Sequence, residues 1–512
     1  MPDSLLVLDG TPLPFASLAR IGAPETRIGV DPVALGRASA SWKMLLEAIM
    51  LVGPIYGVST GVGAQKSVRV ADSQLGRFHA GLVRAHHFGI GEPLPAPVVR
   101  AAMAIRANTA LGGHAGCSAA LIQRLVAMLN ADAVPIVRRE GSLGCADIGL
   151  MGQIASAMTG AGEIVLSGVR MPARDALERC AMAPFDMAHK DALAAVSSNA
   201  TGYASAFHAV RRGAGVLRAL LAAGIASAAA MGASTAPWKA ATAMGSAQQA
   251  TFGRWLTRAS EASGIESTKA LQDPLSVRMM PQVFAAVFDA ATRAGAAIVA
   301  ETARSDDNPV VVGDALMTSG GSLPLDVALA LQGLALALAH CARNAMNRCV
   351  LIANGRMRDL PINLAPPSGD VTGFGPALKL AGELFARAHA LSQPISAQAL
   401  VVADALEDEA TLLPLIVERI DQQATALIRL AALEALMAAQ AMDLVGDRPQ
   451  GLVGALHAIV REHCAFTDVD RPISGDLEAL AALLEVPETL ARLAAHAPLP
   501  DIDRFFALPP NG

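Results

Sequence analysis

Residues 416–431 read IVERIDQQATALIRLA, and their apolar side chains repeat with the period of an α-helix. Ile416, Ile420, Ala424, Leu427 and Ala431 follow one another at steps of four, four, three and four residues. This spacing places all five side chains on one face of a helix. Ala- and Leu-rich stretches of this kind fill most of the chain after about residue 190, where alternating strand patterns are scarce. The sequence therefore predicts a mainly α-helical protein.

The predicted domain organisation follows from a change in the character of the sequence. Residues 1–195 combine short apolar segments, turns and helical stretches, and we expect them to form a mixed, mostly helical N-terminal domain. We expect residues 196–512 to form a bundle of long helices followed by C-terminal helices. Residues 219–238 carry no charged side chain, but they are mostly Ala, Gly and Ser and include Pro237. That composition favours a buried Ala-rich helix over a membrane span.

Composition excludes several classes of protein. Of the 512 residues 53% are hydrophobic and 17% are charged, so the chain is not intrinsically disordered. The net charge of −5 provides no basic surface for nucleic acid. None of the six cysteines forms a C-x-x-C pair, which favours reduced thiols and a cytoplasmic location. The chain has no His-Glu-x-x-His motif, so we predict no metal site.

Segments that contain Gly and Pro interrupt the helical pattern and are candidates for function, since binding and catalytic residues concentrate in loops. Residues 56–63 read YGVSTGVG, and residues 82–94 read LVRAHHFGIGEPL. Further candidate segments are Gln272-Asp273-Pro274 with Arg278, Asp307-Asn308-Pro309, Ser319-Gly320-Gly321 and Leu406-Glu407-Asp408.

Taken in order, these segments resemble conserved blocks of the aromatic amino-acid ammonia-lyase family, which includes histidine ammonia-lyase. Residues 56–63 are similar to the family loop Tyr-Gly-x-Asn-Thr-Gly-x-Gly, and Leu406-Glu407-Asp408 is similar to an acidic helical segment. The resemblance covers about residues 50 to 410. It implies the all-α ammonia-lyase/fumarase-like fold, a long helix bundle with a smaller mixed N-terminal domain. It also implies a homotetramer of two-fold symmetry with sites shared between chains.

The sequence departs from the family pattern at its centre. The family forms an electrophilic methylidene-imidazolone (MIO) from an internal Ala-Ser-Gly, but here the aligned residues are Cys145-Ala146-Asp147. If the alignment has a one-residue deletion, Asp147 matches the family Asp and only Cys145-Ala146 remain. Either alignment lacks the Ser hydroxyl that is lost on dehydration and the Gly nitrogen that closes the ring. We therefore expect no MIO and no other cofactor. Leu275 is a second departure, because the family usually has Tyr there.

Loss of the electrophile points to a substrate with a better leaving group. A trimethylammonium group has no lone pair to attack an electrophile and leaves as neutral trimethylamine. The sequence looks like the branch of the family that eliminates trimethylamine from ergothioneine, the betaine of 2-thiohistidine, and gives thiourocanate. Two alternatives stay open: elimination from another histidine betaine such as hercynine, and a catalytically inactive family member that binds an imidazole metabolite. Histidine deamination fits least, because of Ala146.

The resemblance also implies site residues. Tyr56 would act as general base, and Lys66 would stabilise its phenolate. Glu407 would hold the imidazole-type ring, and Lys379 would polarise the ring or its sulfur. Arg278 would clamp the substrate carboxylate, a task that suits a bidentate guanidinium. His86, Asn199, Phe374 and Asn308 complete the substrate-binding set, in which Asn199 would orient the carboxylate.

Each of these residues also has a structural interpretation. A single buried Tyr is often only a packing residue, and Lys66 or Lys379 could be solvated surface groups. Glu407 lies in an acidic cluster that could belong to a helix N-terminus. Asn308 fits a structural loop residue at least as well as a substrate contact. Cys145 has no basic neighbour in sequence, which favours a small buried side chain over a nucleophile.

Overall fold

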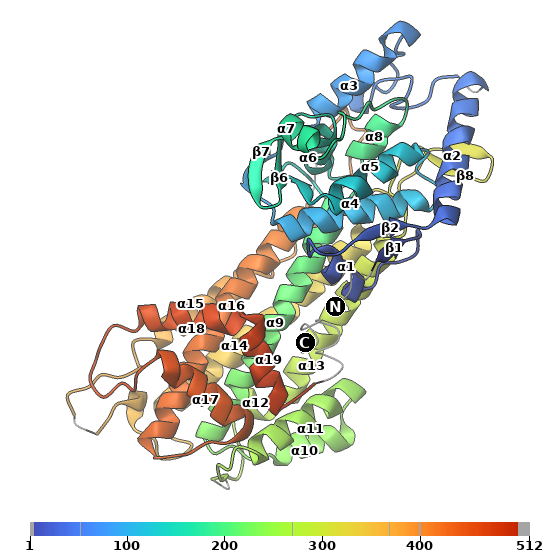
Figure 1. Cartoon of the computed structure of the whole chain (residues 1–512). Helices are drawn as coiled ribbons and strands as arrows, with labels where there is room; N and C mark the ends of the chain where they lie inside the picture. The colour runs from blue at the N-terminus through green and yellow to red at the C-terminus, as the bar shows by residue number, and fades with distance from the viewer. Residues whose placement is uncertain (1–4, 52, 269, 368, 399–400, 500–512) are drawn as a thin grey trace. The chain divides into compact units, whose positions relative to one another are not determined.

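The computed structural model describes residues 5–51, 53–268, 270–367, 369–398 and 401–499, and it confirms a mainly helical chain (Figure 1). The chain divides into two compact units, each described here by itself. Unit 1 contains residues 1–208, 295–329 and 394–417. Unit 2 contains residues 209–294, 330–393 and 418–512.

This division differs from the predicted domains. The predicted boundary after residue 195 lies close to the end of the first segment of unit 1 at His208. Two later segments, residues 295–329 and 394–417, return to unit 1 although the sequence assigned them to the second domain. The reason is that the long helices have residues in both units. The period of apolar side chains predicts a helix, but it does not predict at which residue the helix passes from one unit to the other.

Every short strand found in the described residues belongs to unit 1. Its elements are β1 (Leu6–Leu8), α1 (Phe15–Ile21), β2 (Ile28–Val30), α2 (Pro32–Leu51), η1 (Gly63–Gln65), η2 (Asp72–Gln74), α3 (Leu75–Ala85), β3 (Ile90–Pro93), α4 (Ala96–Leu111), α5 (Ala119–Asn130), β4 (Ala133–Pro135), β5 (Arg138–Glu140), α6 (Ile148–Met158), β6 (Glu163–Leu166), β7 (Val169–Pro172), α7 (Ala173–Arg179), α8 (Asp191–Val196), β8 (Val310–Val312) and β9 (Ala315–Met317). β1 and β2 pair in parallel; β3–β5, β4–β6–β7 and β8–β9 are antiparallel.

Helix α4 is the centre of unit 1. Every residue from Val98 to Leu111 is buried, and the helix packs against α5, which lies beside it in Figure 1. A helix that is buried on all sides is a core element and not a surface helix. Helix α6 packs against α3 and α8, so the segment that precedes α6 is fixed to the core of this unit.

Four long helices have residues in both units: α9 (Ala200–Ala230), α13 (Met280–Glu301), α14 (Leu325–Asn354) and α16 (Leu413–Leu444). By length and composition alone, four apolar helical segments of the described chain could cross a membrane. In the segment Asp191–Ala230, 94% of the most apolar window is buried inside the protein. This burial supports the predicted buried Ala-rich helix, although the helix ends at Ala230 and does not reach residue 238.

Among its described residues, unit 2 contains helices and loops and no β-strand. Besides its parts of the long helices it contains α10 (Ala236–Met244), α11 (Ala247–Glu261), α12 (Leu275–Arg278), η3 (Ile362–Leu364), α15 (Leu378–Leu391), α17 (Gly451–His463), α18 (Ser474–Glu485) and α19 (Pro487–His496). α10 and α11 pack as an antiparallel pair, and α17 packs against α18 and α19 (Figure 1). Ser246 and Gln249 form a capping box that begins α11.

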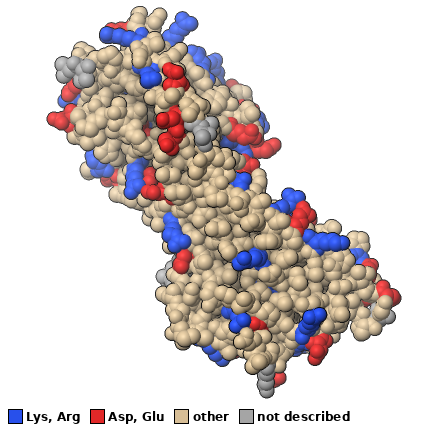
Figure 2. Space-filling view, turned by 180° about the vertical axis from the view of Figure 1, so that it is seen from behind, with Lys and Arg blue, Asp and Glu red and all other residues tan. Residues whose placement is uncertain are grey.

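The surface carries scattered charges. On the face shown in Figure 2, most of the area is uncharged, and basic and acidic residues lie in small mixed groups without a continuous basic band. A protein that binds nucleic acid needs a basic band or patch to neutralise phosphates. The distribution on this face therefore gives no reason to revise the expectation drawn from the net charge.

Candidate active site

Tyr56 lies in a tight turn of unit 1 that follows α2. The carbonyl oxygen of Ile55 accepts hydrogen bonds from the N–H groups of Val58, Ser59 and Thr60. Gly57 has φ +65°, and a Cβ there would lie 2.6 Å from a methyl carbon of Leu193, so the turn needs glycine. The phenolic oxygen of the half-buried Tyr56 accepts a hydrogen bond of 3.0 Å from the N–H of Gly63. The Gly-rich loop thus folds back onto its own tyrosine.

The surroundings of Tyr56 favour its neutral form. Burial raises the pKa of Tyr56, the hydrogen bond from Gly63 opposes the rise, and the carboxylate of Glu407 adds to it. Lys66 follows η1, and its side chain is exposed. Within the described residues of this chain, Lys66 is not among the groups that shift the pKa of Tyr56. The role of Lys66 at the phenolate stays a prediction.

The segment aligned with the MIO-forming tripeptide forms a left-handed turn before α6. Ala146 has φ +66° and Asp147 has φ +26°, a region that residues other than glycine rarely adopt. The N–H of Ala146 donates to the side-chain oxygen of Asn199 at 2.8 Å. The surrounding hydrogen bonds therefore fix an unusual backbone conformation.

The carboxylate of Asp147 anchors the same segment. It is fully buried and accepts hydrogen bonds from the hydroxyls of Ser142 (2.5 Å) and Thr201 (2.8 Å) and from the N–H of Gly202 (2.6 Å). Burial raises the pKa of Asp147, and these three donors oppose the rise. The residue at the end of the altered tripeptide thus ties the turn to the first turn of α9.

Asn199 is a bridge between two loops. Besides accepting from Ala146, its side-chain NH₂ donates to the carbonyl oxygen of Ser322 at 2.8 Å, and its backbone N–H donates to Asp306 at 2.5 Å. Asn308 accepts a hydrogen bond of 2.9 Å from the N–H of Ser319. In this chain both amides serve the loop structure, as the structural interpretation of Asn308 expected. Their predicted contacts with a substrate stay predictions.

A buried ionic cluster supports these loops, and the sequence did not single it out. Arg106 donates to both carboxylate oxygens of Asp307, at 2.9 and 3.1 Å, and Lys190 lies 3.6 Å from Asp307. Burial raises the pKa of Asp306 to about 7 against the opposing effect of Arg106. Lys190 is one of only six lysines, and that rarity was the one available signal.

Glu407 lies in a loop and not in the helix that the resemblance implied. Its backbone pairs with Val402 in an isolated β-bridge, while Ala403, Asp404 and Ala405 all have positive φ values. Three consecutive left-handed residues are incompatible with an α-helix. Helix α16 begins only at Leu413. The assignment of Leu406–Asp408 to a helix was therefore wrong, although Glu407 does lie close enough to Tyr56 to affect its pKa.

A cavity of about 360 Å³ connects the altered turn with the Glu407 loop within unit 1. Its lining residues are Phe88, Gly141, Ser142, Leu143, Cys145, Ile148, Val402, Glu407, Glu409 and Ala410. Cys145 lies 3.5 Å from the hydroxyl of Ser322, and burial raises the pKa of its thiol. The cavity falls within the usual size of small-molecule sites, about 300–1,000 Å³.

His86 lies at the end of α3 beside this region. Its Nδ1 lies 2.7 Å from the carbonyl oxygen of Leu82, so that this nitrogen is engaged with the preceding turn. His86 is half-buried and is not among the lining residues of the cavity. Its predicted contact with the substrate stays a prediction.

Three predicted residues belong to unit 2. Arg278 ends α12, and its Nε is buried without a hydrogen-bond partner among the described residues. Lys379 is exposed in the first turn of α15. Phe374 is only 2% exposed and packs in the core of unit 2, which does not support the predicted contact with a substrate. Whether Arg278 and Lys379 join Tyr56 in one site stays a prediction.

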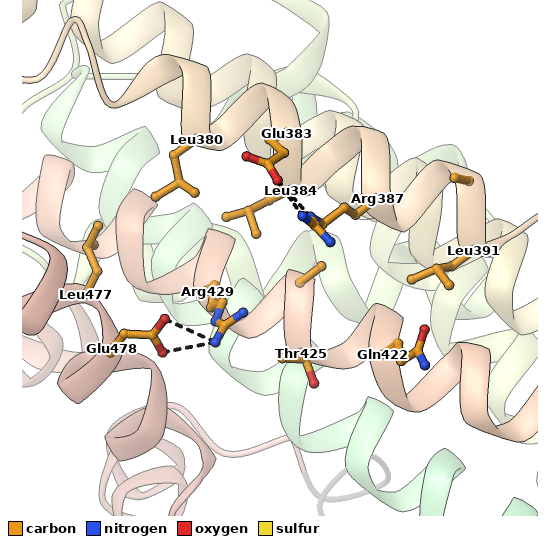
Figure 3. A pocket seen from close by; sticks show the side chains of 12 residues that line it. Leu380, Glu383, Leu384, Arg387, Leu391, Gln422, Thr425, Arg429, Leu477 and Glu478 are labelled. Atoms are coloured by element: carbon orange, nitrogen blue, oxygen red, sulfur yellow. Dashed lines mark hydrogen bonds and ion pairs between the residues drawn. The ribbon is translucent and has the colours of Figure 1, made fainter.

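Unit 2 also contains a groove of about 620 Å³ between α15, α16 and α18 (Figure 3). Its four charged residues form two ion pairs: Arg387 with Glu383 at 2.7 Å, and Arg429 with Glu478 at 3.1 Å. Since these pairs leave no charged group of the groove free for a ligand, the cavity of unit 1 is the better candidate site.

Comparison with known sequences identifies the family of the chain. A family model described as aromatic amino acid lyase matches residues 13–462. The histidine ammonia-lyase of Paracidovorax citrulli is 29% identical over 503 residues, 96% of this chain and 98% of that protein. The histidine ammonia-lyase of Symbiobacterium thermophilum is 29% identical over 491 residues, 94% of this chain and 96% of that protein.

Solved structures share the fold. Ergothionase from Treponema denticola, solved in complex with desmethyl-ergothioneine sulfonic acid, gives a TM-score of 0.92 at 25% identity and covers 96% of this chain and 100% of that chain. Histidine ammonia-lyase from Trypanosoma cruzi gives a TM-score of 0.86 at 23% identity, with 99% and 97% coverage. These matches confirm the ammonia-lyase fold that the sequence predicted.

Proposed function

Because this chain belongs to the aromatic amino acid lyase family, we propose that it eliminates trimethylamine from ergothioneine and gives thiourocanate. The family and the histidine ammonia-lyase relatives make it a carbon–nitrogen lyase. The choice of substrate is the proposal. It has support from the similarity to ergothionase, which covers nearly the whole chain.

The single observation that carries the proposal is Cys145-Ala146-Asp147 in place of Ala-Ser-Gly. No hydroxyl is present in these three residues for the dehydration that makes MIO, and the Asp147 carboxylate is already used by Ser142, Thr201 and Gly202. We infer that the protein works without an electrophilic cofactor. The substrate then needs a leaving group that departs without first bonding to an electrophile, and trimethylammonium is such a group.

In the proposed reaction Tyr56 takes a proton from the β-carbon. The electron pair of that C–H bond forms the new double bond, and the Cα–N bond breaks with its pair on nitrogen. The products are trimethylamine, thiourocanate and the proton held on Tyr56. Tyr56 must be ionised to act, and its hydrogen bond from Gly63 stabilises the phenolate. Lys66 and Lys379 supply the further positive charge in this proposal, and Arg278 binds the carboxylate.

The test is trimethylamine release from the purified protein when ergothioneine, hercynine and histidine are offered in parallel. The proposal expects trimethylamine and thiourocanate from ergothioneine, with no ammonia from histidine. Mutation of Cys145 to Ala serves as a control, since it removes the thiol without restoring the Ser of the family tripeptide.

Other outcomes would replace the proposal. Release mainly from hercynine would keep the mechanism and reject the thione as the recognised group. Ammonia from histidine would agree with the names of the sequence relatives and contradict the absence of the electrophile. No turnover together with binding of an imidazole metabolite would indicate an inactive member of the family.

A further inference from the structure

The cavity of unit 1 is lined by apolar side chains together with two carboxylates. Leu143, Ile148, Val402 and Ala410 provide apolar side chains, and Glu407 and Glu409 provide two carboxylates. Among the described residues that line it, none is Lys, Arg or His. An apolar cavity with negative charge at its rim is complementary to a cation that has an apolar surface.

The two carboxylates are free to meet such a cation. The structure records no ion pair for Glu407 or Glu409 with any described basic residue, whereas other acidic side chains of unit 1, such as Glu163, have Arg partners. Glu409 is exposed and Glu407 is half-buried, so the charge reaches the cavity without the full cost of burying an unpaired carboxylate.

Phe88 adds an aromatic ring to the lining of the cavity. It is 49% exposed, and glycines make room for its ring: a Cβ at Gly149 would lie 2.5 Å from a ring carbon, and one at Gly141 would lie 3.4 Å from it. Ring faces attract cations, and quaternary ammonium groups in particular are recognised in this way.

We propose that this cavity binds the trimethylammonium group of the substrate through Glu407, Glu409 and the ring of Phe88. The inference rests on the proposed function and assigns Glu407 to the cationic group of the substrate instead of its ring. A trimethylammonium group has no N–H to donate, so apolar walls leave none of its atoms unsatisfied. A primary ammonium has three donors, and any donor that does not reach Glu407 or Glu409 would be left unpaired against the apolar walls.

The position of Glu407 agrees with this arrangement. Its carboxylate raises the pKa of Tyr56, so it lies within electrostatic range of the proposed base. The ammonium group and the β-hydrogen of the substrate are on adjacent carbon atoms. A site that holds the first beside Glu407 therefore brings the second towards Tyr56.

The first experiment measures occupancy of the cavity without turnover. Cys145 lines the cavity, and of the six cysteines only Cys145 and Cys180 are partly exposed. Alkylation of Cys145 by iodoacetamide, followed by peptide mass spectrometry, reports access to the cavity, and alkylation of Cys180 is the internal control. We expect tetramethylammonium chloride to slow alkylation of Cys145 at least about twofold, whereas ammonium and sodium chloride at equal concentration have no effect.

Variants identify the residues that bind the quaternary ammonium ion. Glu409→Gln and Phe88→Leu should each raise the concentration of tetramethylammonium needed for protection by about two- to fivefold. Glu47→Gln is the matched control, since it removes an exposed carboxylate of the same unit that forms a weak pair with Lys43 at 3.9 Å. With ergothioneine as substrate, Glu409→Gln should raise KM without lowering kcat, because the positive charge that Glu409 contacts in the bound substrate decreases as the C–N bond breaks.

Equal protection by tetramethylammonium, ammonium and sodium, or no protection by any of them, would overturn the assignment of the cavity. Trimethylamine release without selective protection would leave the proposed function intact and reject only this inference. Selective protection without trimethylamine release from any betaine would reject the proposed function. In that case the cavity would still be a quaternary ammonium site.

Discussion

At the scale of single residues, Tyr56 and Glu407 illustrate what folding adds. They come from loops at opposite ends of unit 1 in the sequence, yet the carboxylate of Glu407 raises the pKa of Tyr56. Burial acts in the same direction, and among the described residues the N–H of Gly63 is the one group that opposes them. A base that is held neutral in this way is a strong base once ionised, but only a small fraction is ionised near neutral pH.

Removing the hydroxyl of Tyr56 tests its role. We expect Tyr56→Phe to lower kcat for ergothioneine by about 10²–10⁴-fold, the usual contribution of a general base. The loss of the hydrogen bond from Gly63 should lower the free energy of unfolding by only about 1 kcal/mol. Trimethylamine release and the melting temperature should be measured on the same preparation. A residual rate within twofold of the unchanged protein would assign the base to another residue.

The pH dependence gives a second test at this scale. Since the pKa of Tyr56 is raised above its usual value near 10 and the phenolate is the active form, kcat/KM should rise with pH throughout the range below that value. Glu407→Gln removes a negative charge that disfavours the phenolate, so it should move the rising limb to lower pH. The pH profile of trimethylamine release measures both. If the rising part of the profile did not move in Glu407→Gln, the electrostatic effect of Glu407 on Tyr56 would be contradicted. If activity already rose near neutral pH in the unchanged protein, positive charges beyond the described contacts of this chain would be lowering the pKa of Tyr56.

At the scale of secondary-structure elements, a buried ion pair joins α14 and α16 within unit 2. Arg348 donates to both carboxylate oxygens of Glu434, at 2.5 and 3.0 Å, and both side chains are fully buried. The N–H groups of Arg348 also donate to Asn344 and to the carbonyl oxygen of Ser276. Such a pair fixes the register of the two helices. Both helices are rich in Ala, and these small side chains alone would specify the register only weakly.

We expect Arg348→Met to lower the free energy of unfolding by about 3–5 kcal/mol, because it leaves the Glu434 carboxylate buried without its partner. The double variant Arg348→Met, Glu434→Leu should recover much of that loss. Arg387→Met is the control, since its pair with Glu383 is exposed and its loss should cost at most about 1 kcal/mol. Chemical denaturation followed by circular dichroism measures all three. Equal effects of Arg348→Met and Arg387→Met would contradict the role of burial.

The loop that carries Glu407 shows the limit of sequence reasoning at this scale. Nothing in the residue types of Ala403, Asp404 and Ala405 excludes a helix. All three nevertheless adopt positive φ values, because the flanking residues Val402 and Glu407 pair with each other. That pairing is a property of the folded chain, and helical propensity is too weak to predict or exclude it. The sequence identified Glu407 as a candidate site residue, but the helix expected around it was wrong.

At the scale of the whole molecule, the exposed positions of Lys66 and Lys379 fit a site completed by other chains. We propose a homotetramer, and sedimentation should give four times the chain mass of 52.5 kDa. Co-expression of Tyr56→Phe with Lys379→Met should restore part of the activity that each variant lacks, if the two residues reach a site from different chains. A monomer, or a tetramer without restored activity, would place both residues in one chain.

The sequence by itself determined the helical fold and the family resemblance, because both depend on local features: the period of apolar side chains, and short motifs in a fixed order. It also identified the altered tripeptide at residues 145–147, from which the proposed chemistry follows. Only the tertiary structure decided which partners those residues have. The bridge from Asn199 to Ala146, the ionic cluster around Asp307, and the cavity with Glu407, Glu409 and Phe88 all join segments far apart in the chain. Their energies depend on burial and on distances across the fold, and neither quantity is encoded in the spacing of residues along the sequence.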